Sequence, residues 1–594
     1  MTVSVFQNRN ILMPVLGLLF FVASSARAQN HADTLRQKHN ESVVIYGSSR
    51  PRTGTALKVE RKPEVPSLAF PSSPVSSSFF DKKVPTVLQL QPVKPLTHIP
   101  VAEKLSVWNN LLTLGLGSRI SPLMEYYYSG GKAKRYRLTV DLRHHSSFLN
   151  IKDYLPSPYT DSKAGIWYDR FFRYHILSFS GGYQIRSNRY YGYNTAGDTL
   201  DYDTKDPNLK QYYQKASFGV QFASAYRTNY KLHHFFRADA YYLSDKHGMS
   251  ETYAGFQFDL HKSFKVTNIF NHQQLGTEGG FCYYQNEADE LPEGYRSEED
   301  YFARFMPYFD ARYGMFSFKA GFNFQWLKQQ SDKLHFYPYL HVNVNVAPGV
   351  FSFFAGVDGG LNKNSLDKMS RENPFLSSMQ KDFRWENTKF EAFGGFRGNI
   401  ARRFGFEFRT GYRSFSDMAY FNHDISLNIG PLFYTNSNGE YIAFKNAYMV
   451  YYTSGHVLDL SGSLTYGNVP GLDVWLKGTY HQYSLDDTEH PLYKPLFEMQ
   501  MGVSYELKKI KPWFEVNYMA ERWAETYQWN IYYPEDPYYR LSRYLDVNIG
   551  ADYLIDKQLS AFIRVTNLLN KQYFRYDGYP VVGLEVMAGI RYRF

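Results

Sequence analysis

The sequence contains a single cysteine, Cys282, among 594 residues. One thiol excludes both an intramolecular disulfide framework and a zinc site built from several cysteines. We therefore expect Cys282 to be a small residue in a buried or lipid-facing position.

Long apolar runs are equally scarce. The extended run at residues 11–22 is shorter than the ~20 residues that a transmembrane helix needs. Arg9 precedes it, and Ala26 and Ala28 follow it in the small-x-small pattern of a signal-peptide cleavage site. The sequence predicts export with cleavage after Ala28, and it excludes a helical membrane protein.

The chain also lacks concentrated charge and catalytic motifs. Its 66 Lys and Arg residues and 56 Asp and Glu residues form no basic run, so no nucleic-acid partner is expected. It has no phosphate-binding glycine loop, zinc-protease helix or nucleophile elbow. The histidine pairs at residues 144–145 and 233–234 point to opposite faces of a strand and cannot chelate together. No cofactor or metal is expected.

Aromatic side chains, by contrast, are abundant. They make up 18% of the residues, with 53 Tyr and 47 Phe. Amphipathic rings are favoured at the two headgroup levels of a membrane β-barrel. In an exported chain without helical spans, this content favours an outer-membrane β-barrel.

Residues 582–594 alternate as a strand with two different faces does. Val586 and Ile590 fall on one face, and Glu585 and Arg591 fall on the other. An apolar and a polar face suit lipid on one side and a water-filled lumen on the other. The same period recurs in residues 404–413, 545–553 and 559–566.

These segments extend over about ten residues, whereas strands of soluble sheets average about five or six. Short turns such as residues 556–558 alternate with long connections at residues 286–300, 361–383 and 522–540. Membrane barrels have short periplasmic turns and long extracellular loops. We predict an all-β fold, a large antiparallel transmembrane barrel of about 22 strands over residues 105–594.

Residues 29–104 differ in composition from the barrel. They are rich in proline and serine, and proline removes backbone donors that central strands need. We predict an extended arm in the periplasm or lumen, without a folded plug. A barrel of about 22 strands has a lumen wide enough to need one.

The C-terminal hairpin carries a family resemblance. Residues 565–573 read Val-Thr-Asn-Leu-Leu-Asn-Lys-Gln-Tyr, and Gly-Tyr-Pro at residues 578–580 and Gly583 follow. An Asn-Leu-x-Asn-x-x-Tyr segment before a Tyr-Pro-x-x-Gly turn and a terminal Phe resembles the last hairpin of TonB-dependent receptors. Leu584 stands where that family often has arginine.

Segments at the start of the barrel point the same way. Residues 109–117, 145–147 and 190–194 resemble receptor-like outer-membrane proteins of the Bacteroidota. The family normally carries a folded plug ahead of the barrel, which residues 29–104 do not match. The resemblance therefore implies the family's barrel without its plug.

Three groups of residues are candidate functional sites. Tyr592 and Phe594 form a C-terminal signal for barrel closure. A lumenal strand or TonB-box-like segment is formed by Val43, Val44, Ile45 and Tyr46. An extracellular loop offers exposed aromatics, which favour contact with a partner or ligand, although the same residues could simply pack on one another: Trp523, Tyr527, Trp529, Tyr532 and Tyr533.

The leading functional hypothesis is a partner subunit of an outer-membrane assembly or secretion complex. A plugless barrel leaks unless a partner, the arm or its own loops close it. The expected partners are outer-membrane lipids and an outer-membrane protein or surface lipoprotein. The alternative is a TonB-dependent or passive nutrient transporter, with TonB engagement left open, and a barrel enzyme is a remote third.

Overall fold

The computed structural model describes the chain from Trp108 to Phe594. Gaps fall at residues 132–134, 193–208, 229, 266–268, 289–297, 379, 381, 402, 424–432, 436–440, 445–446, 468–470 and 526–537, and only the backbone is described at residues 433–435 and 441–444. The predicted signal peptide, the arm at residues 29–104 and the segment at residues 43–46 lie outside the described residues. They remain predictions.

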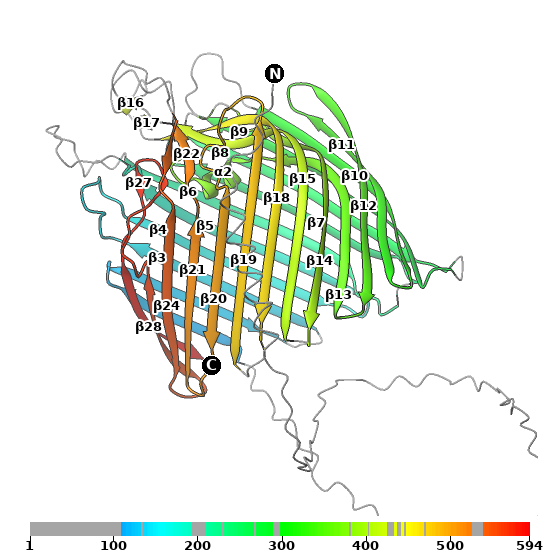
Figure 1. Ribbon diagram of the computed structural model, residues 1–594, viewed down its shortest axis with the longest axis horizontal. Helices are drawn as coiled ribbons and strands as arrows, with labels where there is room; N and C mark the ends of the chain where they lie inside the picture. The colour runs from blue at the N-terminus through cyan, green and yellow to red at the C-terminus, as the bar shows by residue number, and fades with distance from the viewer. Residues whose placement is uncertain are drawn as a thin grey trace, which may run out of the picture. The chain divides into compact units, whose positions relative to one another are not determined.

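The strands form one closed antiparallel barrel of 22 strands (Figure 1). They are β1 (Asn110–Gly117), β2 (Ser121–Gly130), β3 (Tyr136–Ser147), β4 (Tyr159–Phe171), β5 (His175–Arg189), β6 (Lys210–Ser224), β7 (His233–Asp245), β8 (Met249–Ser263), β9 (His272–Ala288), β10 (Glu298–Tyr313), β11 (Phe316–Lys328), β12 (Asp332–Ala347), β13 (Phe351–Lys363), β14 (Trp385–Ile400), β15 (Phe404–His423), β18 (Tyr448–Tyr466), β19 (Leu472–Leu485), β20 (Phe497–Tyr505), β21 (Ile510–Met519), β24 (Tyr544–Leu554), β25 (Leu559–Thr566) and β28 (Glu585–Arg593). The predicted fold class and strand number are confirmed.

Smaller elements lie in the connections. The helix α2 (Leu366–Glu372) lies between β13 and β14, and three two-stranded hairpins lie in later loops. The hairpins are β16 (Phe433–Thr435) with β17 (Tyr441–Phe444), β22 (Arg522–Glu525) with β23 (Tyr538–Leu541), and β26 (Phe574–Tyr576) with β27 (Tyr579–Pro580). Among the described residues, no helix has the length and apolarity to cross a bilayer.

The first and last strands close the ring. β28 pairs with β25 on one side and with β1 on the other, where Leu112 lies opposite Tyr592. The amide of Asn110 donates to the carbonyl oxygen of Phe594 at 3.0 Å, and the amide of Phe594 donates to that of Asn110 at 3.2 Å. Closure removes the unpaired edges that a lipid environment does not tolerate.

The alternation predicted for the last strand holds. Val586 and Ile590 are exposed on the outer face, whereas Met587 on the inner face is buried. Inner faces of neighbouring strands carry matched charges: Arg137 pairs with Asp169 at 2.6 Å. The outer surface is therefore apolar and the lumen polar, as in a membrane barrel.

The two ends of the barrel differ in the length of their connections. Residues 556–558 form a short turn between β24 and β25, as predicted. The strand ends that the long connections join, of β9 and β10, of β13 and β14, and of β21 and β24, lie at the opposite end. Phe594 lies at the short-turn end (Figure 1). Short turns mark the periplasmic side, so the long loops are extracellular.

Cys282 is half-buried on β9. It packs against the buried cluster of Leu327, Leu361 and Trp385. The described residues contain no cluster of three or more His, Cys, Asp or Glu side chains able to hold a metal ion.

Candidate functional site

The largest cluster of buried apolar residues in the described part of the chain lies in the extracellular loops and the strand ends that meet them. We call this cluster the loop core. It consists of Leu155, Tyr190, Leu209, Tyr213, Leu243, Met249, Leu366, Met369, Phe375, Leu376, Phe383, Ala419, Phe421, Ala447, Tyr448, Val450, Leu492, Tyr493, Ala524, Leu541, Tyr576 and Tyr579. Loops of membrane barrels thus build here the kind of core that soluble domains build between layers.

The loop core joins opposite sides of the barrel. Tyr190 follows β5 and Tyr448 begins β18. These two strands lie on opposite sides of the ring, nearly half of its strands apart in either direction. The Tyr190 hydroxyl donates to the carbonyl oxygen of Leu376 at 2.6 Å, and Leu376 forms a parallel bridge with Tyr448. The loops therefore pack across the extracellular mouth.

Residues 364–384, between β13 and β14, hold the central position in this packing. We call them the mouth loop. Its helix α2 begins at an N-cap, Ser365, whose hydroxyl accepts from the Lys368 amide at 3.2 Å. Leu366 and Met369 are buried in the loop core, one turn apart, so the helix has an apolar face.

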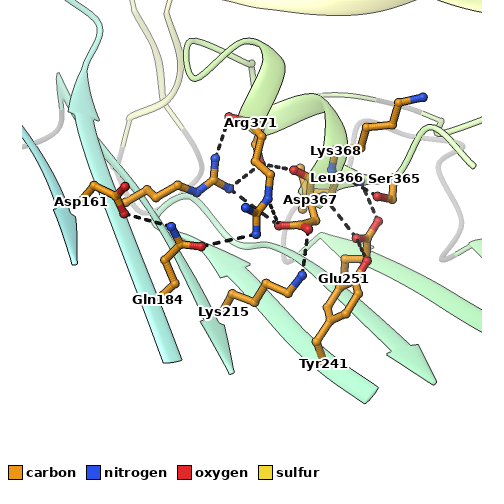
Figure 2. A network of polar contacts seen from close by, with 12 residues as sticks. Asp161, Gln184, Lys215, Tyr241, Glu251, Ser365, Leu366, Asp367, Lys368 and Arg371 are labelled. Atoms are coloured by element: carbon orange, nitrogen blue, oxygen red, sulfur yellow. Dashed lines mark hydrogen bonds and ion pairs between the residues drawn. The ribbon is translucent and has the colours of Figure 1, made fainter. Parts of the chain in front are cut away.

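The barrel wall completes the cap of this helix. Glu251 on β8 is fully buried, and its carboxylate accepts from the amides of Leu366 at 2.6 Å and Asp367 at 3.2 Å (Figure 2). The Tyr241 hydroxyl donates to the same carboxylate at 2.8 Å. A carboxylate at a helix N-terminus is stabilised by the free amides and the helix dipole. This contact binds the mouth loop to β8. In the ring, β9–β12 lie between β8 and β13, the strand from which the loop begins.

Asp367 forms the second contact with the wall. Its carboxylate accepts from Lys215 Nζ on β6 at 2.8 Å and from Arg371 Nε at 2.9 Å (Figure 2). Arg186 on β5 lies 3.9 Å from it and donates to the Ser370 carbonyl oxygen at 3.0 Å. Burial raises the pKa of Asp367, but Lys215 and Arg371 outweigh this effect, so its pKa lies below the ordinary value.

The second half of the mouth loop is held by neutral and acidic groups. Asn188 Nδ2 donates to the carbonyl oxygen of Pro374 at 3.0 Å. The Ser378 hydroxyl donates to the buried carboxylate of Asp245, and Gln211 Nε2 donates to both partners at 3.1 Å. Polar contacts with the wall therefore extend from α2 to Ser378.

Aromatic packing links the mouth loop to the last extracellular loop. The rings of Phe375 and Tyr579 stack with centroids 3.6 Å apart and an interplanar angle of 13°. Tyr191 packs edge-on against Tyr579 at 5.1 Å and donates its hydroxyl proton to the Pro580 carbonyl oxygen at 2.9 Å. Such pairs add about 0.5–1.5 kcal/mol beyond the area they bury.

The motif behind the family resemblance positions Tyr579. Asn567 has a positive φ of 48°, and its side-chain amide donates to the Val582 carbonyl oxygen at 3.1 Å. Asn570, also at φ 48°, accepts from the Leu584 amide at 2.9 Å. Asparagine tolerates this left-handed conformation better than most residues. The two asparagines therefore shape the loop that delivers Tyr579 to the loop core.

Solved structures share this architecture. The siderophore receptor PirA from Acinetobacter baumannii matches with a TM-score of 0.60 and 11% identity, over 82% of this chain and 80% of that chain. A ferric enterobactin receptor, PfeA, from Pseudomonas aeruginosa matches at 0.58 and 11%, over 82% and 80%. The pyoverdine outer membrane receptor FpvA from the same organism, bound to pyoverdine, matches at 0.59 and 13%, over 82% and 78%.

The chain has the barrel fold of these siderophore receptors. The predicted resemblance to TonB-dependent receptors is thereby confirmed for the barrel. No family model matches the chain, and no curated protein matches it in sequence. The receptor-type barrel also implies an outer-membrane location, since its closed wall and apolar outer face suit that bilayer.

Within this receptor-type barrel, the predicted aromatic loop is described only in part. The ring of His490 stacks on the ring of Trp523, with centroids 3.6 Å apart and an interplanar angle of 3°, and the Arg540 guanidinium lies 4.6 Å from the Trp523 ring. Trp523 is therefore packed against side chains of the protein itself. Residues 527–533, with the other four candidate aromatics, lie outside the described residues.

The predicted C-terminal signal residues face lipid at the closing strand. Tyr592 and Phe594 are 39% and 45% exposed, and their rings stack at 5.2 Å. The backbone of Phe594, not its side chain, pairs with Asn110. These positions suit an accessible C-terminal signal, which stays a prediction.

The mouth loop was not predicted as a site. Its sequence, Ser365-Leu366-Asp367-Lys368, carries a helix cap, and a capped helix inside a long extracellular loop is a usable indication of local structure. Its partners Glu251 and Lys215 belong to distant strands, which sequence spacing does not connect.

Proposed function

We propose that this chain is an outer-membrane transporter whose extracellular mouth is gated by the mouth loop. The observation that carries the proposal is the docking of α2 on the far wall, through Glu251 and Asp367. A polar lumen offers a path for a solute, and the loop core lies across its entrance. A transporter needs such a closure, because an open barrel of this size would leak.

The docking contacts have the chemistry of a reversible gate. They are hydrogen bonds and ion pairs, so water or a polar solute would replace each partner once the loop moves. An apolar seal alone would offer a solute nothing to compete for. Release of α2, together with the contacts of Asn188, Gln211 and Asp245, would free the mouth loop from β5–β8 while leaving every barrel strand paired.

A ferric siderophore is the first solute to test. The neighbours in fold are receptors for siderophores, including ferric enterobactin and pyoverdine. The predicted TonB-box-like residues Val43, Val44, Ile45 and Tyr46 would make uptake depend on the proton-motive force through TonB. Uptake that persists in a variant lacking residues 43–46 would instead indicate passive transport.

Single-channel conductance in planar bilayers tests the gate. Four proteins are compared: the full mature chain, a variant with residues 366–372 replaced by an equally long Gly-Ser segment, a variant lacking residues 29–104, and the combination. We expect low conductance for the full chain and a rise when the helix is replaced, largest in the combined variant. Equal conductance in all four proteins would refute gating by this loop.

A second role is that of a partner subunit in an outer-membrane assembly or secretion complex. It rests on the predicted absence of a folded plug in residues 29–104. The loop core supplies an intramolecular closure, which removes one reason for requiring a partner. Purification from native membranes with mass spectrometry distinguishes the roles: stable recovery of insertase or surface-lipoprotein subunits supports this one, and recovery of the barrel alone supports transport.

A further inference from the structure

The periplasmic ends of β4–β7 carry a compact group of cationic side chains. Arg173 lies in the turn between β4 and β5, and Arg227 and Lys231 lie in the turn between β6 and β7. All three are exposed. Arg170, at the end of β4, completes what we call the cationic rim.

The cationic rim has no acidic partner within the described residues. None of Arg170, Arg173, Arg227 and Lys231 forms an ion pair or a side-chain hydrogen bond there, whereas Arg137 on the neighbouring strand is paired with Asp169 at 2.6 Å. The sequences of the two turns contain no aspartate or glutamate. The positive charge is therefore available to a ligand.

Arg170 faces the lipid. It lies on the same face of β4 as the outward Ile166, which is 49% exposed, and opposite Leu177 on the outer face of β5. Its guanidinium lies 5.9 Å from the ring of Phe172. An arginine on the outer face at a strand end extends its charged group toward the headgroup level.

Aromatic rings surround the cations. Lys231 Nζ lies 4.8 Å from the ring centroid of Tyr174 and 4.9 Å from that of Tyr226, and Arg173 lies 5.1 Å from the Tyr174 ring. On the outer face above them, the rings of His175, Phe222 and His234 pack together with each pair of centroids 5.1 Å apart. Such rings mark the headgroup level of a membrane barrel.

We propose that the cationic rim binds the headgroup of an anionic phospholipid in the periplasmic leaflet. Guanidinium groups bind phosphate with paired hydrogen bonds, and a lysine adds charge. The rings and Leu232, which is 53% exposed, would contact glycerol and the upper acyl chains. A soluble anion uses only the charge, whereas a lipid also uses the outward position of Arg170 and the apolar surface around it.

The test uses the purified full mature chain in detergent, titrated with phosphatidylglycerol or phosphatidylcholine and analysed by native mass spectrometry. The variant Arg173→Gln/Arg227→Gln/Lys231→Gln removes three exposed charges at the rim. The matched control Lys152→Gln/Arg543→Gln/Lys571→Gln removes three exposed charges at the extracellular end. Heat-modifiable mobility on a gel verifies that each barrel is folded.

We expect the native chain to prefer phosphatidylglycerol, and the rim variant to bind it about tenfold or more weakly, since each cation near a membrane surface contributes roughly fivefold. The control should keep the native affinity. Equal affinity for both lipids, or an equal loss in rim variant and control, would overturn the proposal. Complete displacement of phosphatidylglycerol by millimolar inorganic phosphate would also overturn it, because the site would then be one for free anions.

Discussion

Glu251, buried in the wall of the barrel, accepts a hydrogen bond from the backbone amide of Leu366 at 2.6 Å. Glu251 lies on β8 and Leu366 lies in the loop after β13, and β9–β12 stand between these two strands in the ring. The contact therefore fixes the mouth loop across the lumen. The free amides of a helix end stabilise such a buried carboxylate. The barrel wall thus supplies the acceptor, and the loop supplies the amide donors.

Replacing Glu251 should release the mouth loop. Glu251→Ala leaves two helix amides and the Tyr241 hydroxyl without their acceptor, which costs roughly 1–3 kcal/mol for each buried unsatisfied group. We expect faster proteolysis within residues 364–384 and higher conductance. Glu125→Gln is the control, because Glu125 pairs with Arg143 on the lumen wall away from the loop. Equal behaviour of the two variants would contradict a specific role.

The docking of α2 should depend on pH through Asp367. Its pKa is lowered in the docked loop, so ionised Asp367 stabilises docking above the ordinary pKa of about 3.9. This stabilisation is lost as the pH falls through the lowered value. We expect the difference in conductance between the native chain and Asp367→Asn to stay constant from about pH 8 to 5 and to disappear below about pH 4. Asp367→Asn should raise conductance at pH 7 and flatten the acid response; an unchanged acid response would assign it to other groups.

The aromatic stack should stabilise the loops without supporting the barrel. Phe375→Ala removes a buried ring from contact with Tyr579, and large-to-small changes in a core cost about 3–5 kcal/mol. We expect faster hydrogen exchange in the loop core and unchanged heat-modifiable mobility of the barrel. Phe322→Ala, which removes a lipid-facing ring that is 54% exposed, should leave loop exchange at the native level. Loss of the folded barrel in Phe375→Ala would show that the loops support strand pairing.

The terminal residue should matter for assembly more than for stability. Phe594→Ala keeps the backbone pairing with Asn110 and removes only an exposed ring stacked on Tyr592. We expect refolding in detergent close to native, with less than about 1 kcal/mol lost, and a several-fold lower yield of membrane-inserted protein in cells. Tyr127→Ala, a change of similar size at an exposed position on β2, is the control. Equal yields of the two variants in cells would contradict a role of Phe594 as a C-terminal assembly signal.

The barrel was predictable because the alternation that reveals it is local to each strand. A strand in a membrane barrel places alternate side chains in lipid and in water, so Val586 and Ile590 and their polar neighbours reveal the fold without knowledge of partners. Loop positions followed from the same pattern, with boundaries shifted by a few residues, since β28 begins at Glu585 and not at 582.

The aromatic loop was harder to interpret. Trp523 lies in a segment whose composition is typical of a ligand surface, yet its ring stacks on His490 and lies close to the Arg540 guanidinium. The local sequence does not distinguish an exposed aromatic side chain from one packed against the protein, because the difference lies in neighbours that come from other loops.

By itself, the sequence of this protein determined a barrel of about 22 strands with an apolar outer face, because two-residue alternation is read within each strand. Only the tertiary structure decided what crosses its mouth. The capped helix at Leu366 acquires its meaning from Glu251, Lys215 and Arg186, which lie on other strands of the ring. Closure of the ring brings these residues close to the helix, and no local periodicity in the sequence indicates contacts between residues so far apart in the chain.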